Sequence, residues 1–208
     1  MESRPATRPV AGSPAATQEG ACSTLRKATA GEHAAVEALP LMAGLMSARV
    51  DMPMYRQVLL RQWQVHAGWE QACGHWLRSL APHWHYRPRA PALQADLRAL
   101  GGQDATPVPV APVPVDADHA WGMLYVVEGA ALGGQLIARH VQAHCPGLAD
   151  ALSHFRGAAL PGAGWRDFRL ALEQALPDTA ARQAAVAGAR AMFRHFHAHL
   201  AEPWMEAA

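Results

Sequence analysis

The 208-residue chain has few of the features that mark secreted, membrane-spanning or nucleic-acid-binding proteins. Its three cysteines, Cys22, Cys73 and Cys145, lie far apart with no C-x-x-C spacing, which argues against a disulfide framework or a zinc ribbon. A net charge of +1 without a basic block gives no electrostatic basis for binding nucleic acid or an acidic membrane. There is no apolar run of about 18 residues and no basic-then-apolar signal segment. We therefore expect a cytoplasmic protein.

Signatures of several enzyme classes are also missing from the sequence. There is no G-x-S-x-G motif, no P-loop and no H-E-x-x-H motif, so hydrolase and nucleotide-binding templates have no support. Two histidine pairs, His140 with His144 and His195 with His199, have the i, i+4 spacing that places two metal ligands on one helical face. Without the H-E-x-x-H arrangement, surface histidines are the better interpretation.

Half of the residues are hydrophobic, which is typical of a globular protein with a real core. Residues 1–22 are rich in Pro, Ala, Thr and Gly, with only Val10 as a large aliphatic residue, so they predict a flexible tail. Residues 23–208 form the expected single domain. Between Pro107 and Val115 prolines recur at nearly alternate positions, which predicts an extended polyproline-like loop.

Apolar residues elsewhere recur with the three-four spacing of amphipathic helices, and no alternating strand pattern occurs. The fold class predicted is all-α, a single-domain helical bundle of seven or eight elements. Asp116 or Asp118 is expected to cap the long central helix, Asp178 the last one, and Ser23 or Thr24 the first. The expected helices span residues 25–39, 41–49, 54–80, 91–100, about 117–145, 164–176 and 178–200.

The central helix contains the segment Leu-Tyr-Val-Val-Glu-Gly-Ala-Ala-Leu-Gly-Gly-Gln, residues 124–135. Each glycine inside a helix is less favourable than alanine by about 1 kcal/mol. Gly129 and Gly133 are four residues apart and lie on one face, where either a neighbouring helix or a flat ligand can approach the backbone. Gly134 beside them favours a local bend. Both interpretations of the face stay open.

A histidine on the first expected helix is the second feature of interest. On a helical wheel Leu25, His33 and Val36 fall within about 80°, so His33 projects from the apolar face. It is either a hydrogen-bonded core residue or a ligand, and neutral imidazole is a common axial ligand of haem iron. Arg26 lies two turns, roughly 10 Å, along the same side, the offset needed to meet a haem propionate. A solvent-exposed arginine is the alternative.

Two motifs together carry a family resemblance. They are Leu-Arg-Lys-Ala-Thr-x-x-x-His-x-x-x-Glu at residues 25–37 and Leu-Tyr-x-x-Glu-Gly-x-x-Leu-Gly-Gly at 124–134. In this order on one all-α chain they resemble the biliverdin-producing haem oxygenases, especially the bacterial branch associated with phytochromes. The resemblance implies that haem is both cofactor and substrate, and that O2 and an external electron donor convert it to biliverdin, CO and ferrous iron. It also implies a reductase or ferredoxin-type donor and suggests a bacteriophytochrome as recipient of the biliverdin.

The resemblance further implies a role for each matching residue. Haem would lie between His33, the axial ligand, and a kinked distal helix, where Gly129 and Gly133 let main-chain atoms shield the ring and steer oxygen toward a meso carbon. Glu37 would orient the imidazole through its second nitrogen. The remaining expected contacts are Tyr125, Arg26 and Arg166 at the propionates, with Arg169 as the competitor of Arg166, and Phe193 and Phe196 as pocket or plain core residues.

One position departs from the pattern. Many haem oxygenases carry an aspartate directly after the first distal glycine, where it anchors the water that protonates iron-bound peroxide, but this chain has Ala130. Glu128 lies about 100° away around the helix and is expected to point elsewhere, toward a surface ion pair. Two rivals therefore stay open, a haem-binding carrier or sensor without turnover and a helical enzyme of the thiaminase-like group acting on another small molecule.

Overall fold

The computed structural model describes residues 19–80, 84–103, 110–157 and 162–203. All regular elements within these ranges are helical, which confirms the all-α prediction. The described part contains more elements than the seven or eight expected. They are α1 (Ala21–Ala28), α2 (Ala30–Glu37), α3 (Pro40–Leu45), α4 (Met52–Ser79), α5 (Ala90–Ala99), α6 (Ala117–His144), the 3-10 helix η1 (Pro146–Ala151), α7 (Ser153–Gly157), α8 (Gly162–Ala175) and α9 (Thr179–Leu200).

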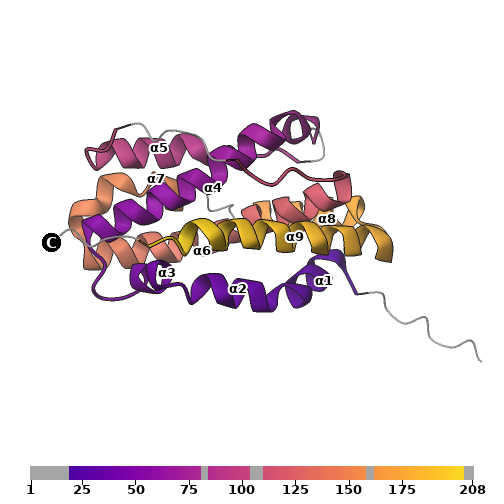
Figure 1. Cartoon of the computed structure of the whole chain (residues 1–208), viewed down its shortest axis with the longest axis horizontal. Coiled ribbons are helices and arrows are strands. Elements are labelled where there is room, and N and C mark those ends of the chain that lie inside the picture. Colours follow the sequence, from indigo (N-terminus) through magenta and orange to yellow (C-terminus); the bar gives the residue numbers. More distant parts are fainter. Residues whose placement is uncertain (1–18, 81–83, 104–109, 158–161, 204–208) are drawn as a thin grey trace, which may run out of the picture.

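Helices α6 and α9 pack against each other at the centre of the bundle. In Figure 1 helices α1, α2 and α3 lie on one side of this pair, and α4, α5 and α7 lie on the other. A Cβ atom on Gly122 of α6 would lie 1.8 Å from the carbonyl oxygen of Ala185, and one on Gly188 of α9 would lie 1.9 Å from that of His119. The two backbones therefore touch, which only glycine permits at these positions.

The helix ends that depend on residues close in sequence agree with the predictions. Asp116 caps α6 by accepting a hydrogen bond from the backbone N–H of His119 at 2.7 Å, and Asp178 caps α9 in the same way through Ala181 at 2.9 Å. After α5 the backbone of Gly101 is left-handed, with φ of 72°, and the helix ends before it as expected. These caps confirm two of the three predicted helix starts.

The prediction for the first helix was wrong in two respects. Helix α1 begins at Ala21, before Ser23, and its first N–H groups donate to the carboxylate of Glu173 in α8, at 2.7 Å from Ala21 N and 3.1 Å from Cys22 N. The expected helix 25–39 is also divided. The hydroxyl of Thr29 donates to the carbonyl of Leu25 at 2.8 Å, a side-chain bond that bends helices, and α2 starts immediately after it.

The segment after α6 holds two elements that the sequence did not predict, η1 and α7. The carboxylate of Asp96 accepts from the backbone N–H groups of Ser153 and His154 at 2.9 and 2.8 Å and so fixes the start of α7. Residues 110–115 are neither helix nor strand, while 107–109 of the expected Pro-rich loop and 1–18 of the expected tail lie outside the described residues. No helix in the described ranges is long and apolar enough to cross a membrane.

Candidate functional site

A cavity of about 830 Å³ lies between the helices of the bundle. This volume falls within the range of roughly 300–1,000 Å³ typical of small-molecule and cofactor pockets. Helices α1 and α2 form one wall, α6 forms another, and α8 and α9 contribute aromatic and basic side chains. Met42 of α3 also lines the cavity, and side chains of α4 and α7, together with Arg89, form the part that we call its inner end.

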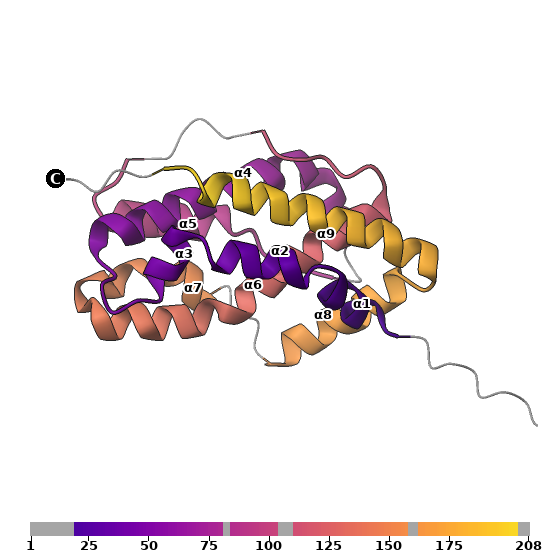
Figure 2. The same ribbon diagram turned by 60° about the horizontal axis from the view of Figure 1, so that its bottom comes forward.

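The glycines of α6 divide into two groups with different surroundings. A Cβ atom on Gly133 would have no neighbour within 4 Å, and one on Gly129 would meet only Trp165 at 4.0 Å. Both line the cavity, so the interpretation of this face as a helix contact is wrong. Gly134 is the contact residue, because its Cβ would lie 2.6 Å from the carbonyl oxygen of Phe155 in α7. Helix α6 runs unbroken, and Figure 2 shows that its ribbon changes direction along its length.

The imidazole of His33 belongs to the cavity wall and not to the hydrophobic core. Its side chain is 59% exposed, and its Nδ1 lies 3.3 Å from a carboxylate oxygen of Glu37 one turn later in α2. The ring of Phe193 in α9 meets it edge-on, with 5.9 Å between the centroids. The carboxylate favours the proton on Nδ1, which leaves Nε2 as the nitrogen that can bind a ligand.

Basic and hydroxyl groups gather at the α1 and α8 side of the cavity. Arg26 and Tyr125 line it, and so does Arg169. Burial raises the pKa of the Tyr125 phenol to about 12, so it remains a neutral hydrogen-bond donor at neutral pH. Two guanidinium groups and a phenol can bind carboxylates of a ligand.

Arg166 is the predicted propionate contact that the structure does not bring to the cavity. Its side chain is 73% exposed and lies 3.5 Å from Asp167. Trp165 and Arg169 are one turn apart and share the cavity face of α8, whereas position 166 is rotated by about 100° from Trp165. Arg169, the competitor, occupies the place expected of Arg166.

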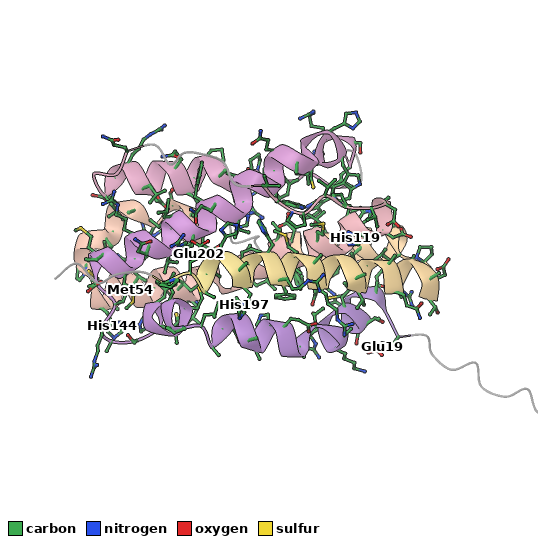
Figure 3. The ribbon with its side chains drawn as sticks, viewed as in Figure 1. Glu19, Met54, His119, His144, His197 and Glu202 are labelled. Carbon is green, nitrogen blue, oxygen red and sulfur yellow. The ribbon has the colours of Figure 1, made fainter. Side chains whose placement is uncertain are left out.

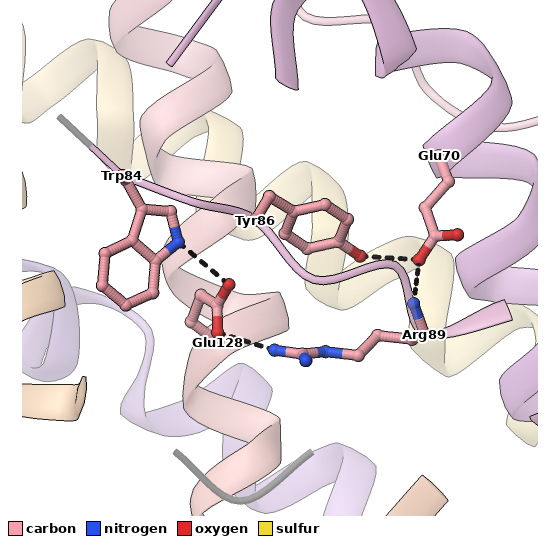
Figure 4. A network of polar contacts seen from close by, with 5 residues as sticks. All are labelled: Glu70, Trp84, Tyr86, Arg89 and Glu128. Atoms are coloured by element: carbon pink, nitrogen blue, oxygen red, sulfur yellow. Dashed lines mark hydrogen bonds and ion pairs between the residues drawn. The ribbon is translucent and has the colours of Figure 1, made fainter. Parts of the chain in front are cut away.

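Glu128 forms an ion pair, but the pair is buried and not on the surface as expected. Its carboxylate accepts from the Arg89 guanidinium at 2.7 Å and from the Trp84 indole at 3.1 Å, and the side chains of Glu128 and Arg89 are 1% and 4% exposed. The backbone N–H of Arg89 donates to Glu70, which also accepts from Tyr86 (Figure 4). Arg89 is therefore held at both its backbone and its guanidinium.

Replacing Glu128 with glutamine should destabilise the protein by about 3 kcal/mol, because Arg89 would keep a buried positive charge without its counter-ion. Urea unfolding followed by circular dichroism measures the change. The matched control is Asp167→Asn, which removes the carboxylate of an exposed pair and should change the free energy of unfolding by under about 0.5 kcal/mol. A loss below about 1 kcal/mol for Glu128→Gln would contradict the interpretation of the pair.

The inner end of the cavity contains polar residues that the sequence did not identify as functional. Gln62 and His66 are one turn apart on the buried face of α4, and His154 comes from α7. The rings of His66 and His154 lie 5.8 Å apart between centroids. Burial lowers the pKa of His154 to about 3 and that of His66 well below its ordinary value, and Arg89 adds to both shifts. Both imidazoles are neutral at neutral pH.

Acidification should therefore destabilise the protein through His154. Between its folded pKa of about 3 and its unfolded value, the unfolded chain binds a proton that the folded chain does not. The free energy of unfolding consequently falls as the pH drops below about 6.5. We expect His154→Leu to remove up to about 1.4 kcal/mol per pH unit from this dependence, as measured by urea unfolding between about pH 7 and 5. An unchanged pH dependence would count against neutral burial of this ring.

In the first of the two histidine pairs weighed as metal sites, a ring nitrogen of each histidine lies within hydrogen-bond distance of a backbone carbonyl. His140 Nε2 lies 3.0 Å from the carbonyl oxygen of Ser47, and His144 Nδ1 lies 2.9 Å from that of His140. Figure 3 shows His144 pointing away from the bundle at one end. His195 is buried, which corrects its assignment as a surface residue. In the part of the chain that the structure describes, no group of three or more metal-ligating side chains occurs.

Fold and cavity together define a class of protein. It is an all-α bundle in which a histidine of one helix and the bare backbone of another line the same cofactor-sized pocket. The chain belongs to the haem oxygenase family, since the protein-family model described as "Heme oxygenase" matches its residues 19–202. A heme oxygenase of Xanthomonas campestris pv. campestris (strain 8004) is 48% identical over 164 residues, which cover 77% of this chain and 97% of that protein.

Solved structures of haem oxygenases have the same fold. The NO- and CO-bound enzyme of Neisseria meningitidis matches with a TM-score of 0.65 and 25% identity, covering 88% of this chain and 91% of that one. Heme oxygenase-1 of the cyanobacterium Synechocystis, solved in complex with heme, matches with a TM-score of 0.69 and 17% identity over 88% and 92% of the two chains. The enzyme of Leptospira interrogans matches with a TM-score of 0.67 and 17% identity over 89% and 100%.

Proposed function

We propose that this haem oxygenase binds haem in the cavity between α2 and α6, with His33 Nε2 as the axial ligand of the iron. The observation that carries the proposal is that His33 and the two glycines line one cavity while Gly133 has no neighbour within 4 Å on its open side. A flat ring can therefore approach the backbone of α6. Bound haem supplies the iron that activates O2 and is itself the substrate, which is cleaved to biliverdin, CO and ferrous iron.

The protein's part of the reaction is to bind and orient. Glu37, 3.3 Å from His33 Nδ1, holds the imidazole with its other nitrogen toward the cavity. Arg26, Arg169 and Tyr125 bind the propionates and so fix the rotation of the ring in its own plane. Because Gly129 and Gly133 let the ring approach the backbone of α6, this rotation decides which meso carbon lies there and is attacked. Phe193 packs beside the imidazole and contributes to the apolar wall.

The partners follow from the chemistry and from the resemblance to the phytochrome-associated branch. Oxidative cleavage consumes electrons that amino-acid side chains do not supply, so we propose a reductase or a ferredoxin-type protein as donor. A bacteriophytochrome that takes up the biliverdin is the proposed recipient, and the cytoplasm is the proposed compartment. Pull-down of a phytochrome with the biliverdin-loaded protein tests the recipient.

Incubating the purified protein with haemin and a reductant under air tests the proposed function. We expect the Soret band to disappear and a biliverdin spectrum to replace it. A Soret band that forms and then persists would support the carrier or sensor without turnover, for which Ala130 in the cavity wall is the motivating residue. Failure to form any Soret band would contradict haem binding itself.

A further inference from the structure

Four of the seven tryptophans of the chain gather around one phenylalanine beside the cavity. The ring of Phe168 in α8 is fully buried, and its centroid lies 5.3 Å from that of Trp165, 5.1 Å from that of Trp84 and 6.3 Å from that of Trp121. Trp121 in turn meets Trp76 of α4 edge-on at 6.0 Å. Aromatic rings in contact have centroids about 4.5–7 Å apart. Trp165, Phe168, Trp121 and Trp76 therefore form an unbroken series of touching rings, which we call the aromatic chain.

The two ends of the aromatic chain have different surroundings. Trp165 lines the cavity, where a Cβ atom on Gly129 would lie 4.0 Å from its indole. Trp76 is half-buried on α4 and does not line the cavity. Between them Phe168 and Trp121 are 0% and 7% exposed. The aromatic chain thus leads from the ring-binding face of α6 through the core to the solvent side of α4.

The chemistry of indole decides what such a chain can carry. An indole ring loses an electron far more easily than other uncharged side chains but is very hard to reduce, so it passes oxidising equivalents outward and not a donor's electrons inward. The Tyr125 phenol, 6.3 Å from Trp165, is a poorer carrier, because burial raises its pKa to about 12 and oxidation requires it to lose its proton. Trp84 is a side branch, since its indole proton would neutralise Glu128 and leave the buried charge of Arg89 unpaired.

We propose that the aromatic chain is an exit route for oxidising equivalents, through which haem oxidised by peroxide in the cavity regains electrons from a one-electron reductant, such as ascorbate, at Trp76. This inference rests on the proposed function, since it requires haem beside Trp165. Hydrogen peroxide takes two electrons from the haem group and two protons from solvent and becomes two water molecules. The aromatic chain returns the electrons one at a time, and each return leaves Trp76 as a radical that has lost its indole proton to solvent. Two ascorbate monoanions, each giving one electron and one proton, restore the indole.

Locating the radical tests the route independently of haem cleavage. The haemin-loaded protein, made with ring-deuterated tryptophan, is mixed with an organic peracid, which takes two electrons and two protons and becomes a carboxylic acid and water. Electron paramagnetic resonance should show an indole radical, and peptide mass spectrometry should find added oxygen at Trp76. In Trp121→Phe we expect the radical and the added oxygen at Trp165 instead. The control Trp69→Phe, which changes a buried indole of α4 outside the aromatic chain, should match the parent protein.

Ascorbate tests the outer end of the aromatic chain. In the parent protein, ascorbate added after the peracid should remove the indole radical, because the radical reaches the half-buried Trp76. In Trp76→Phe the radical should still form, at the buried Trp121, and its removal by ascorbate should be lost. Stopped-flow absorption of the tryptophanyl radical measures both decays. The substitution lies at the surface and keeps an aromatic ring, so we expect the fold to persist.

The outcomes separate this inference from the function on which it rests. The same radical site and the same response to ascorbate in the parent protein, Trp121→Phe and Trp76→Phe would overturn the exit route while leaving haem cleavage intact. Oxygen added at Tyr125 or Trp84 instead of Trp76 would overturn it too. A parent protein that forms no Soret band would count against the proposed function. Circular dichroism shows whether each variant is folded, and if Trp121→Phe unfolds, the parent protein and Trp76→Phe still decide.

Discussion

Replacing His33 with alanine is expected to abolish haem ligation while leaving the fold intact. The side chain is 59% exposed and its contact with Glu37 is an exposed i, i+4 pair, so the free energy of unfolding should change by under about 0.5 kcal/mol. Loss of a residue that merely orients a metal ligand typically lowers affinity 10–100-fold. Loss of the ligand itself should therefore lower haem affinity by at least about 100-fold. Titration with haemin, followed at the Soret band, measures this change.

The matched control for His33→Ala is His197→Ala, which removes an exposed imidazole of α9 that does not line the cavity. It should bind haem like the parent protein. Added imidazole should restore a six-coordinate spectrum and part of the activity to His33→Ala, because a small ligand can enter the space that the side chain leaves. An unchanged haem spectrum in His33→Ala would refute the ligand assignment.

Gly133→Leu is expected to produce the second large loss, a protein that folds well and binds no haem. A Cβ atom at this position meets nothing within 4 Å, and because Gly133 lines the cavity, a larger side chain there takes the space of the ring. Replacing a helical glycine by a helix former should also raise the free energy of unfolding by roughly 0.5–1 kcal/mol. Haemin titration of this variant measures the loss of haem binding, and urea unfolding measures the gain in stability.

The neighbouring residue provides the control for Gly133→Leu. A Cβ atom on Gly134 would lie 2.6 Å from the carbonyl oxygen of Phe155, so Gly134→Ala should force α6 and α7 apart and destabilise the protein by about 1–3 kcal/mol. Its open cavity should still bind haem when the protein is folded. If both glycine variants instead lost stability equally, the division of the glycines into cavity and contact residues would be wrong.

The parts of the fold that depend on residues close in sequence were predictable. The apolar stripes of α4, α6 and α9 give long helices. Asp116 and Asp178 cap their helices by accepting a hydrogen bond from the backbone N–H three residues later. The start of α1 was not predictable, because Glu173, which accepts from its first N–H groups, is about 150 residues away in the chain. The short helix α7 depends in the same way on Asp96 of α5.

In the candidate site, too, only the features that depend on residues close in sequence were predictable. The motifs around His33 and Gly133 identify residues that the structure brings to one cavity. The choice between Arg166 and Arg169 depends on the rotation of α8 about its axis, which only packing determines. The partner of Glu128, Arg89, lies in another segment of the chain, so the sequence around Glu128 gives no indication that the pair is buried. Spacing can thus suggest ligands, whereas burial and pairing require the assembled bundle.

The carboxylate of Glu173 has a further consequence for the part of the cavity wall that α1 and α8 form. It joins the beginning of α1 to α8, and Arg169 precedes it by one turn of α8 while Arg26 follows later in α1. Any motion that widens the gap between these two helices must first break those two hydrogen bonds. The two bonds therefore hold together the two helices that carry Arg26 and Arg169.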